Sequence, residues 1–298
     1  MRDILLYLVA VLIWGTTWFA ITFQLGVVAI EWSLVYRFAL ATVVLFAICL
    51  GTGRELKFPR RAHLVFLGLG AFLFSSNYYF SYLGVAYITS GLVAVVFSTL
   101  PLMNIFNGRV FLKRRLEPPI VVASLVGIGG IALMFWPELG AGASNDKALL
   151  GMVIVLIATY LASLGNTIAG GRSASKLPVL SMSAWGMLYG TGFLTAASLL
   201  NGNPVVFETT KPYIFSLVYL SLFGTVIAFT SYLELIKRIG AERAGYISVA
   251  FPVVALAIST FFEGYQWSIP AALGMVLVLG GNVYILRTRQ KKVEPRPA

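Results

Sequence analysis

Tyrosine and serine side chains recur at helical spacing inside one long apolar stretch of the chain. Ser75, Tyr78, Tyr79 and Tyr82 stand at positions i, i+3, i+4 and i+7, so they share one face of a helix. If the stretch crosses a bilayer, their hydroxyl groups find no water in the hydrocarbon and face the bundle interior or a wet cavity. Aromatic rings edged with hydroxyls suit a small amphipathic solute with an apolar side chain. The spacing therefore predicts one wall of a binding cavity.

Similar residues recur in the other apolar stretches. Thr159, Ser163 and Asn166 form a second stripe, with Tyr160 beside it, and two tryptophans in the first stretch are four residues apart. The alternatives are interhelical hydrogen bonding for Ser, Thr and Asn, and an interfacial belt for Trp and Tyr. The predicted substrate-binding residues are Trp14, Trp18, Arg37, Ser75, Tyr78, Tyr79, Tyr82, Thr159, Tyr160, Ser163, Asn166, Trp185, Tyr246 and Ser248.

Arg37 is the one basic residue well inside an apolar stretch. A buried arginine is costly in a membrane, and such residues usually have a function. Its planar guanidinium can bind a carboxylate through two parallel hydrogen bonds. The structural alternatives are a side chain that extends to the lipid headgroups, or an ion pair with Glu31. We therefore expect Arg37 either to contact a substrate carboxylate or to have one of these structural roles.

Acidic residues are missing from the middle of every apolar stretch. Proton-coupled pumps usually carry an intramembrane acid as a relay, so the pattern argues against proton antiport and favours a facilitator. Glu234 lies near the end of its stretch, and we expect it to pair with Lys237 or Arg238. The single cysteine and single histidine of the chain leave little from which to build a metal site or a catalytic dyad. We expect no cofactor, no metal and no enzymatic activity.

The composition places these residues in a membrane. Of 298 residues, 59% are hydrophobic and 11% are charged, whereas a soluble domain carries about 25% charged residues. A helix needs about 20 apolar residues to cross a bilayer. Ten such stretches are predicted: Ile4–Phe23, Trp32–Leu50, Ala62–Ala86, Ser90–Phe111, Pro119–Trp136, Ala148–Ala169, Val179–Leu200, Tyr213–Ile236, Ala244–Phe262 and Ser268–Leu286. The predicted fold class is an all-α polytopic membrane protein with ten transmembrane helices.

Basic residues alternate between successive loops. Eighteen Lys and Arg residues lie in the termini and loops of one side, and only Lys147 and Lys211 lie on the other. Cytoplasmic loops carry the excess of Lys and Arg, so both termini are predicted to be cytoplasmic. The net charge of +11 is then explained by topology, which argues against nucleic-acid binding.

The second half of the chain repeats landmarks of the first. Four pairs stand 151 residues apart: Pro101 and Pro252, Pro119 and Pro270, Gly129 and Gly280, Gly130 and Gly281. Each copy predicts a helix kinked at its first proline, a tight turn and a second helix. Because five is odd, the two five-helix repeats, residues 1–140 and 141–298, must be inverted, as in many secondary transporters. Pro101 and Pro252 are candidate hinges, with static kinks as the alternative.

Three segments of the chain resemble a known family. They are LLYLVAVLIWGTTWFAIT (5–22), the block containing Pro101 and Pro119, and GTVIAFTSYLELIKRIGAERAGYISVAFPVVALAISTFFEG (224–264). The sequence resembles the EamA-type branch of the drug/metabolite transporter superfamily, and within it bacterial inner-membrane exporters of amino acids, including aromatic ones. The resemblance implies ten helices in inverted repeats, and a central cavity that opens alternately to each side. Small multidrug pumps of the same superfamily depend on a glutamate in the first helix, and this first helix has none.

Residues and resemblance together predict a multi-pass inner-membrane facilitator that exports small amphipathic metabolites, most of all amino acids including aromatic ones. Its expected partners are the small-molecule substrate and the lipid bilayer. The alternative within transport is a proton-coupled exporter of drugs or quaternary cations, which should have carboxylates in its cavity. A membrane-embedded enzyme would need catalytic groups that the spans lack. A structural or signalling role would leave the inverted duplication unexplained.

Overall fold

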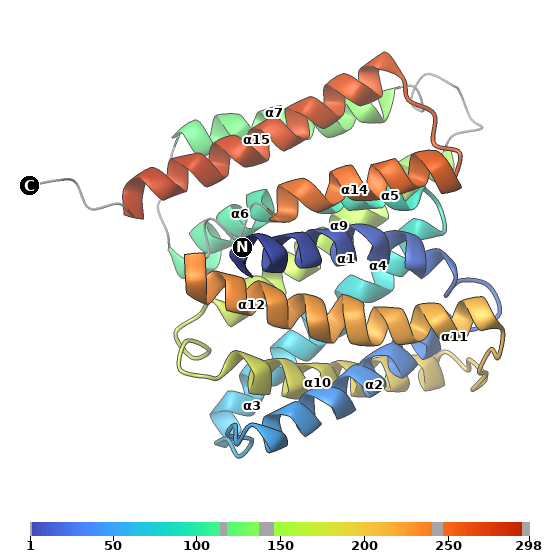
Figure 1. The fold of residues 1–298 in the computed structure, drawn as a ribbon, viewed down its shortest axis with the longest axis vertical. Coiled ribbons are helices and arrows are strands. Elements are labelled where there is room, and N and C mark those ends of the chain that lie inside the picture. Colours follow the sequence, from blue (N-terminus) through green and yellow to red (C-terminus); the bar gives the residue numbers. More distant parts are fainter. Residues whose placement is uncertain (1, 114–117, 137–145, 240–246, 294–298) are drawn as a thin grey trace, which may run out of the picture.

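A computed structural model describes residues 2–113, 118–136, 146–239 and 247–293 of the chain. The described residues form helices joined by short connections, with no strand among them. The helix axes lie roughly parallel to one another, and the chain passes back and forth through a single bundle (Figure 1). The first helix begins and the last helix ends at the same end of this bundle.

The first half of the chain follows the predicted apolar stretches closely. Its elements are α1 (Arg2–Thr22), α2 (Ile30–Gly51), α3 (Arg60–Ala71), η1 (Phe72–Ser76), α4 (Asn77–Val85), α5 (Ser90–Phe97), α6 (Leu100–Leu112) and α7 (Pro118–Met134). The segment η1 is a π-helix that joins α3 to α4.

The second half has the same succession of helices. Its elements are α9 (Asp146–Ala169), α10 (Val179–Leu200), α11 (Lys211–Val218), η3 (Tyr219–Ile227), α12 (Ala228–Ile239), α14 (Ile247–Phe262) and α15 (Ile269–Val293). Among the described residues, six helical stretches are long and apolar enough to cross a membrane, by length and composition. Three further apolar helices, residues 121–134, 247–262 and 269–284, are shorter. The protein is thus an all-helical, multi-pass membrane protein.

Two π-helical segments occupy corresponding places in the two halves. Segment η1 interrupts the third apolar stretch and η3 interrupts the eighth, where the sequence predicted uninterrupted α-helices. A hydroxyl side chain in each segment bonds to a backbone carbonyl. Ser75 Oγ donates at 2.8 Å to the carbonyl of Ala71, the residue before η1, and Thr225 Oγ1 donates at 2.9 Å to the carbonyl of Leu220 within η3. A π-turn takes in an extra residue, so the side chains that follow it are rotated about the helix axis.

The fourth apolar stretch is broken, whereas the sequence predicted only a kink. Helix α5 ends at Phe97 and α6 begins at Leu100, with Pro101 as its second residue. Proline has no N–H to offer the carbonyl four residues earlier, here that of Phe97. Pro252, at the matching position of the second half, lies inside the continuous helix α14. The two halves therefore differ at their corresponding prolines.

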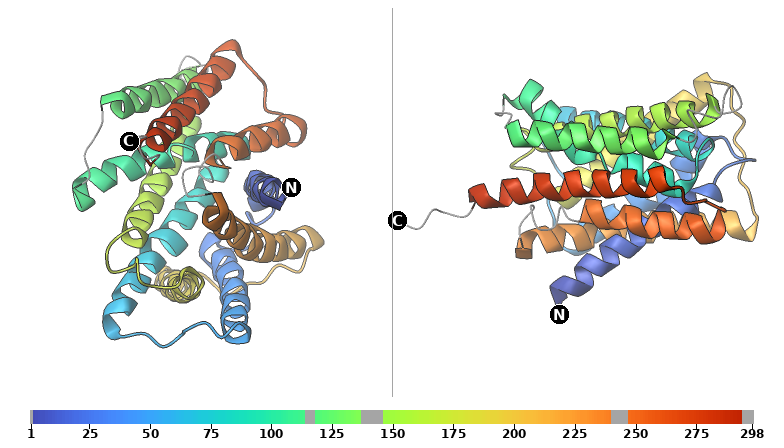
Figure 2. Two further views of the ribbon diagram at one scale, coloured as in Figure 1. Left: turned by 60° about the vertical axis from the view of Figure 1, so that its left-hand side comes forward. Right: turned by 90° about the horizontal axis from the view of Figure 1, so that it is seen from above.

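The helix contacts have the same pattern in both halves. Helix α1 packs against α12 and α14, while α9 packs against α4 and α6. Helices α7 and α15 pack along each other and form one edge of the bundle (Figures 1 and 2). Glycine residues allow the backbones of α7 and α15 to approach closely. A Cβ at Gly130 would lie only 2.7 Å from the carbonyl oxygen of Gly274.

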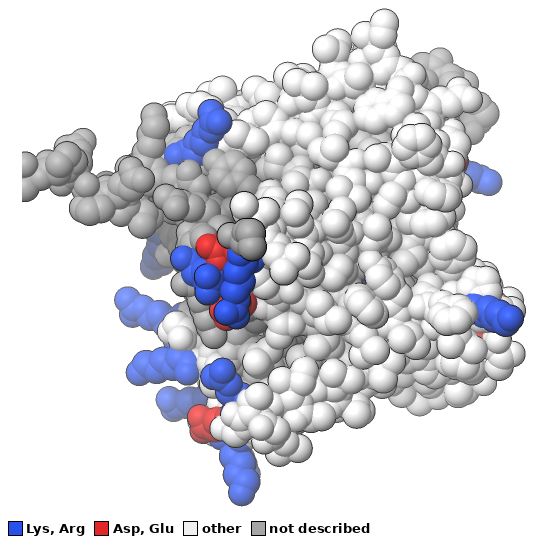
Figure 3. Space-filling model, viewed as in Figure 1, with Lys and Arg blue, Asp and Glu red and all other residues white. Residues whose placement is uncertain are grey.

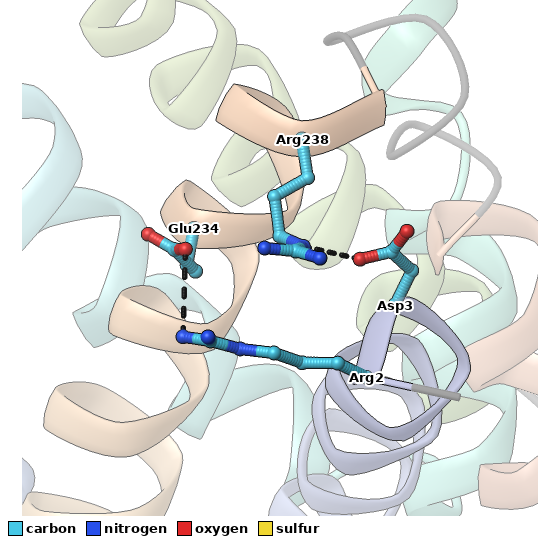
Figure 4. A network of polar contacts seen from close by, with 4 residues as sticks. All are labelled: Arg2, Asp3, Glu234 and Arg238. Atoms are coloured by element: carbon cyan, nitrogen blue, oxygen red, sulfur yellow. Dashed lines mark hydrogen bonds and ion pairs between the residues drawn. The ribbon is translucent and has the colours of Figure 1, made fainter.

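Charged residues gather at the ends of the bundle, and the visible face between them is uncharged (Figure 3). At one end two ion pairs join α1 to α12 (Figure 4). Arg2 Nη2 lies 3.7 Å from Glu234 Oε1, and Arg238 Nε donates to Asp3 Oδ1. Glu234 therefore pairs with Arg2, while Arg238, one of the two partners expected from the sequence, forms its ion pair with Asp3. The side chain of Lys237, the other expected partner, lies outside the described residues. Both pairs are partly exposed, so solvent screens them and they stabilise the fold only weakly.

The crossing of α10 with η1 provides a test of this packing. A Cβ at Gly190 would lie 2.8 Å from the carbonyl oxygen of Phe74, whereas a Cβ at Gly192 would meet nothing within 4 Å. We expect Gly190→Ala to lower the free energy of unfolding by about 1–3 kcal/mol, because the backbones must separate. Gly192→Ala, on the same helix, should change it by less than about 0.5 kcal/mol. Thermal unfolding in detergent measures both, and equal melting temperatures for the two variants would contradict the described packing.

Candidate substrate cavity

A cavity of about 400 Å³ lies inside the bundle, between elements of both halves. Its walls come from α1, α2, the η1–α4 segment, the α5–α6 break, α9, η3, α12 and α14. The lining is mostly apolar and aromatic. Among the described lining residues Arg37 is the one charged side chain. The irregular segments of the bundle, η1, η3 and the break, thus all contribute to the cavity wall.

The guanidinium of Arg37 is fixed by neutral acceptors. Arg37 is only 2% exposed, and its Nη1 donates to Tyr82 Oη at 3.1 Å while Nη2 donates to Thr225 Oγ1 at 3.4 Å. The hydroxyl proton of Thr225 goes to the carbonyl of Leu220, so its oxygen remains free to accept from Arg37. Segment η3 and helix α4 therefore orient this side chain from two sides.

Aromatic rings surround the same guanidinium. Its carbon Cζ lies 4.9 Å from the ring centroid of Tyr78, 5.6 Å from that of Phe38 and 6.0 Å from that of Tyr82. A desolvated cation over an aromatic face gains about 2 kcal/mol or more. These contacts keep the guanidinium inside the bundle rather than at the lipid headgroups.

No carboxylate of the described residues neutralises Arg37. Glu31, the partner considered from the sequence, instead accepts a hydrogen bond from Asn201 Nδ2 at 3.2 Å. The Nε atom of Arg37 is buried and has no hydrogen-bond partner among the described residues. A buried charge without a counter-charge is strongly disfavoured. The cavity wall therefore carries a positive charge that an anionic group of a ligand can neutralise.

Neutral polar groups occupy the rest of the wall. Ser81 Oγ donates to Asn77 Oδ1 at 3.3 Å, and Asn166 Nδ2 donates to Asn104 Oδ1 at 3.4 Å. Amides both donate and accept, so they can orient a polar ligand without adding charge. Across the described part of the chain, no three His, Cys, Asp or Glu side chains gather where they could hold a metal ion.

Two tryptophans of α1 form an aromatic part of the lining. Trp14 donates from Nε1 to the Gly224 carbonyl at 3.3 Å, which joins α1 to η3. The Trp18 ring centroid lies 5.1 Å from that of Phe97 and 6.4 Å from that of Phe251. Trp18 thus lies between the end of α5 and helix α14. Apolar rings at this place can receive the hydrocarbon part of a ligand.

The structure brings together only some of the residues predicted from the sequence. Those that line the cavity are Trp14, Trp18, Arg37, Tyr78, Asn166, Ser248 and the candidate hinge Pro101. Those outside the lining are Ser75, Tyr79, Tyr82, Thr159, Tyr160, Ser163, Trp185 and the candidate hinge Pro252. Tyr246 lies outside the described residues. Substrate contact stays a prediction for every one of them.

The residues outside the lining have other contacts. Thr159 bonds to the Val155 carbonyl of its own helix, and Ser163 accepts from Asn107 Nδ2 at 2.9 Å. Tyr160 is 38% exposed. Tyr82 is fully buried and supports Arg37 without lining the cavity.

Trp185 belongs to a separate aromatic cluster. It donates from Nε1 to the Leu56 carbonyl at 3.1 Å, and its ring centroid lies 4.8 Å from that of His63. His63 Nδ1 in turn lies 2.9 Å from Tyr189 Oη. The cluster fastens the loop after α2 to α10, so its evident role is structural.

The π-segment η1 separates Ser75 from the three tyrosines with which the sequence grouped it on one helix face. A regular helix would align Ser75 with Tyr78, Tyr79 and Tyr82, but the extra residue in η1 rotates α4. Asn77, Tyr78 and Ser81 then line the cavity together with Leu73. The signal present in the sequence was the Asn77 and Ser81 pair at i and i+4.

A polar cluster joins α5 to α14 at the other end of the bundle from the chain's first residues. Glu263 accepts from the Ser90 backbone N–H at 3.2 Å, from Ser90 Oγ at 2.6 Å and from Ser259 Oγ. Ser259 Oγ accepts from the Gly91 N–H at 2.8 Å. A carboxylate at a helix N-terminus is favoured because it bonds the free N–H groups and meets the positive end of the helix dipole. The cluster therefore holds the two helices together at this end.

Removing the hydroxyl of Tyr82 tests the fixation of Arg37. Tyr82→Phe leaves the buried Nη1 without its acceptor, which should cost about 1–3 kcal/mol of stability. Tyr79→Phe, three residues earlier on α4, is the matched control and should have little effect. Melting temperatures of the purified variants in detergent compare them. Equal losses would show that the Arg37–Tyr82 bond does not stabilise the fold.

Comparison with known proteins gives the chain its family. The EamA-like transporter family matches residues 1–136 and 149–287. The inner membrane transporter YedA of Escherichia coli K12, which is described as uncharacterized, is 29% identical over 279 residues, covering 89% of this chain and 85% of YedA. Protein PagO of Salmonella typhimurium is 23% identical over 282 residues, covering 92% of each chain.

A further relative and a solved structure extend over nearly the whole chain. An uncharacterized transporter from the trpA 3' region of Buchnera aphidicola subsp. Schlechtendalia chinensis is 25% identical over 283 residues, covering 95% of this chain and 91% of the relative. A crystal structure of another protein, 20% identical, superposes with a TM-score of 0.68 and covers 98% of this chain and 99% of that one. It shares the fold. The chain belongs to the EamA-like transporter family.

Proposed function

We propose that this transporter exports small amphipathic metabolites from the cytoplasm, most of all amino acids, aromatic ones included. The observation that carries the proposal is the cavity itself. It joins the uncompensated cation of Arg37 to a mostly aromatic and apolar lining. A carboxylate can take two N–H groups of a guanidinium, and an aromatic side chain can pack on the apolar wall. The volume of about 400 Å³ is within the range of small-molecule sites.

Two inverted five-helix repeats, residues 1–140 and 141–298, supply the frame in this proposal. Three observations support the duplication: the same family matches both parts of the chain, the π-segments correspond, and the helix contacts have one pattern. The proposal includes ten spans with both termini in the cytoplasm. It also includes an inner-membrane location, the one that the name of YedA gives for that relative.

Alternating access follows from this frame. The cluster of Glu263, Ser90 and Ser259 lies on the outer side in the proposed topology and closes the bundle there. The cavity lining reaches Ile247 and Ser248 at the cytoplasmic start of α14. The described conformation is therefore assigned as closed toward the outside. The prolines at 101 and 252 are the proposed hinges.

The distribution of acidic residues supports a facilitator rather than a proton-coupled drug pump. Among the described residues that line the cavity there is no Asp or Glu. Glu234 forms an ion pair with Arg2 at one end of the bundle, and Glu31 near the other end is hydrogen-bonded to Asn201. A cation exporter needs a counter-charge in its cavity, and this lining offers a cation instead.

Efflux from proteoliposomes tests the proposed function. Vesicles are loaded with labelled phenylalanine, labelled threonine or a quaternary-ammonium dye, with and without an imposed pH gradient. We expect phenylalanine efflux that is independent of the pH gradient and no efflux of the dye. Arg37→Gln should abolish most of the phenylalanine efflux, because the neutral amide cannot replace the charge.

An exposed cation provides the control for this experiment. Arg172→Gln removes a positive charge from the connection between α9 and α10, outside the cavity lining, and should leave efflux unchanged. Proton-driven efflux of the dye without phenylalanine flux would contradict the proposal. It would favour the proton-coupled exporter of cations.

The proposed closure of the outer side by the Glu263, Ser90 and Ser259 cluster leads to a second prediction. In a Cys49→Ala background, Ser81→Cys provides the single cysteine, which lines the cavity. Glu263→Gln should raise its rate of labelling by a membrane-impermeant maleimide added outside intact cells by about tenfold, because the charge-assisted bonds across α5 and α14 are weakened. Glu208→Gln, in an exposed loop at the same end, is the control and should have no effect. Unchanged labelling in Glu263→Gln would mean that the cluster does not close the outer side.

A further inference from the structure

Two carboxamides on the cavity wall bond to each other and leave part of their hydrogen-bonding capacity unused. Asn166 Nδ2 of α9 donates to Asn104 Oδ1 of α6 at 3.4 Å, and both residues line the cavity. Within the described part of the chain, no other group bonds to either carboxamide. The amino group of Asn104 and the carbonyl oxygen of Asn166 are therefore available to a ligand.

The presence of these two available groups does not depend on which carboxamide donates. Each carboxamide has one carbonyl oxygen and one amino group, and a hydrogen bond between two of them joins the amino group of one to the oxygen of the other. The amino group of one residue and the oxygen of its neighbour always remain. The pair thus offers a donor and an acceptor side by side, and it adds no charge to the wall.

The neighbouring polar contact between the same two helices is of a different kind. Asn107 Nδ2 donates to Ser163 Oγ at 2.9 Å, and both residues are fully buried outside the cavity lining. A bond of this kind joins α6 to α9 without any access to the cavity. Asn104 and Asn166 differ because the cavity reaches them, which a purely structural bond does not require.

Arg37 and the amide pair lie at different depths of the bundle. Helices α2 and α6 finish at the same end, the one where the chain begins (Figure 1). At a rise of 1.5 Å per residue, Arg37 stands about 21 Å before the end of α2, and Asn104 stands about 12 Å before the end of α6. The pair is therefore about 10 Å closer to this end than the backbone of Arg37. An aromatic amino acid in an extended conformation can bridge such a separation.

The wall next to the pair is apolar on the side toward the arginine. Leu100 and Pro101 come one turn before Asn104 on α6, and both line the cavity. Ala162 comes one turn before Asn166 on α9 and lines it as well. An apolar wall of this kind can receive an aromatic ring. Along the bundle axis the cavity thus presents a cation, an apolar wall and a neutral donor–acceptor pair.

We propose that the Asn104–Asn166 pair binds a hydroxyl group on the side chain of the substrate while Arg37 binds its carboxylate. This rests on the proposed function and gives its substrate class a preference for hydroxylated aromatic amino acids, of which tyrosine is the simplest. A phenolic hydroxyl donates to the available carbonyl oxygen and accepts from the available amino group. A phenyl ring at the same place takes both amide groups out of water without pairing them, which is unfavourable.

Binding of three ligands that differ at one ring position tests the assignment. Labelled phenylalanine, tyrosine and 4-methylphenylalanine are bound to the purified full-length protein. Tyrosine has a hydroxyl group at the para position, and 4-methylphenylalanine has a methyl group of similar size. We expect tyrosine to bind about tenfold more tightly than phenylalanine, the effect of two neutral hydrogen bonds. 4-Methylphenylalanine should bind no more tightly than phenylalanine, because a methyl group cannot pair with the amides.

Variants on the two helices separate ligand contact from packing. Asn166→Leu and Asn104→Leu each replace a carboxamide by an apolar side chain of similar shape. The ratio of tyrosine affinity to phenylalanine affinity should fall from about tenfold to about one in both. Ser163→Ala is the control, because it removes the acceptor of the other bond between α6 and α9 and lies outside the lining. It should leave the ratio unchanged. Melting temperatures establish that each variant is folded.

The results separate this inference from the proposed function. Equal wild-type affinity for tyrosine and phenylalanine overturns the inference, and so does equally tight binding of tyrosine and 4-methylphenylalanine. A ratio that stays at its wild-type value in both asparagine variants, or that falls equally in Ser163→Ala, overturns it too. In each case phenylalanine efflux would still support amino-acid export. If the wild type neither binds nor exports phenylalanine or tyrosine, the proposed function fails and the inference fails with it.

Discussion

The absence of water in the bilayer core is the constraint on which this structure depends. Every backbone N–H and carbonyl group there must find a partner within the protein, which is why the described spans are helical. Departures from the regular helix therefore need local compensation. Among the described spans they include η1, η3 and the α5–α6 break, and all three lie on the cavity. Hydroxyl groups of Ser75 and Thr225 and the amide of Asn282 provide that compensation.

The same constraint explains the position of Arg37. A guanidinium in hydrocarbon needs acceptors, and Tyr82 and Thr225 supply two neutral ones. Neutral acceptors satisfy hydrogen bonds but leave the net charge in place. The protein therefore keeps a fixed, oriented cation that is not matched by a described carboxylate. A site of this kind is preorganised for an anionic group, because little of the side chain has to move when a ligand binds.

Much of the fold could be predicted from the sequence, because apolar length and loop charge are properties of the chain alone. The helices begin and end close to the predicted limits, and Arg37 could be identified as the unusual buried cation. Of the predicted site residues, some line the cavity and others lie outside the lining. Helical periodicity placed Ser75 on one face with the tyrosines of α4, but η1 includes Ser75 and ends before α4 begins. The residues of α4 that line the cavity are Asn77, Tyr78 and Ser81.

The sequence also did not predict which residues from distant parts of the chain pair with each other. Glu234 had basic neighbours on its own helix, yet its partner Arg2 comes from the start of the chain. The break at Pro101 could not be distinguished from the continuous helix at Pro252. At the break, the Ser98 carbonyl accepts from Asn282 Nδ2, which lies far away in sequence. Pairings between distant segments depend on how the helices pack, which periodicity and composition do not contain.

Pro101 lies at a helix break and Pro252 lies inside a continuous helix, and this difference affects the balance between conformations. If two inverted halves were identical, the inward-facing and outward-facing forms would be one structure viewed from opposite sides, with equal free energy. A break in only one half makes the two forms different in structure, because α5–α6 and the continuous helix α14 are not equivalent. Their free energies are then no longer equal. Under the proposed alternating access, one of the two facing forms then has the lower free energy in the empty protein. Under the proposed facilitator mechanism, the apparent affinities on the two sides of the membrane then differ, although a facilitator adds no energy to the net flux.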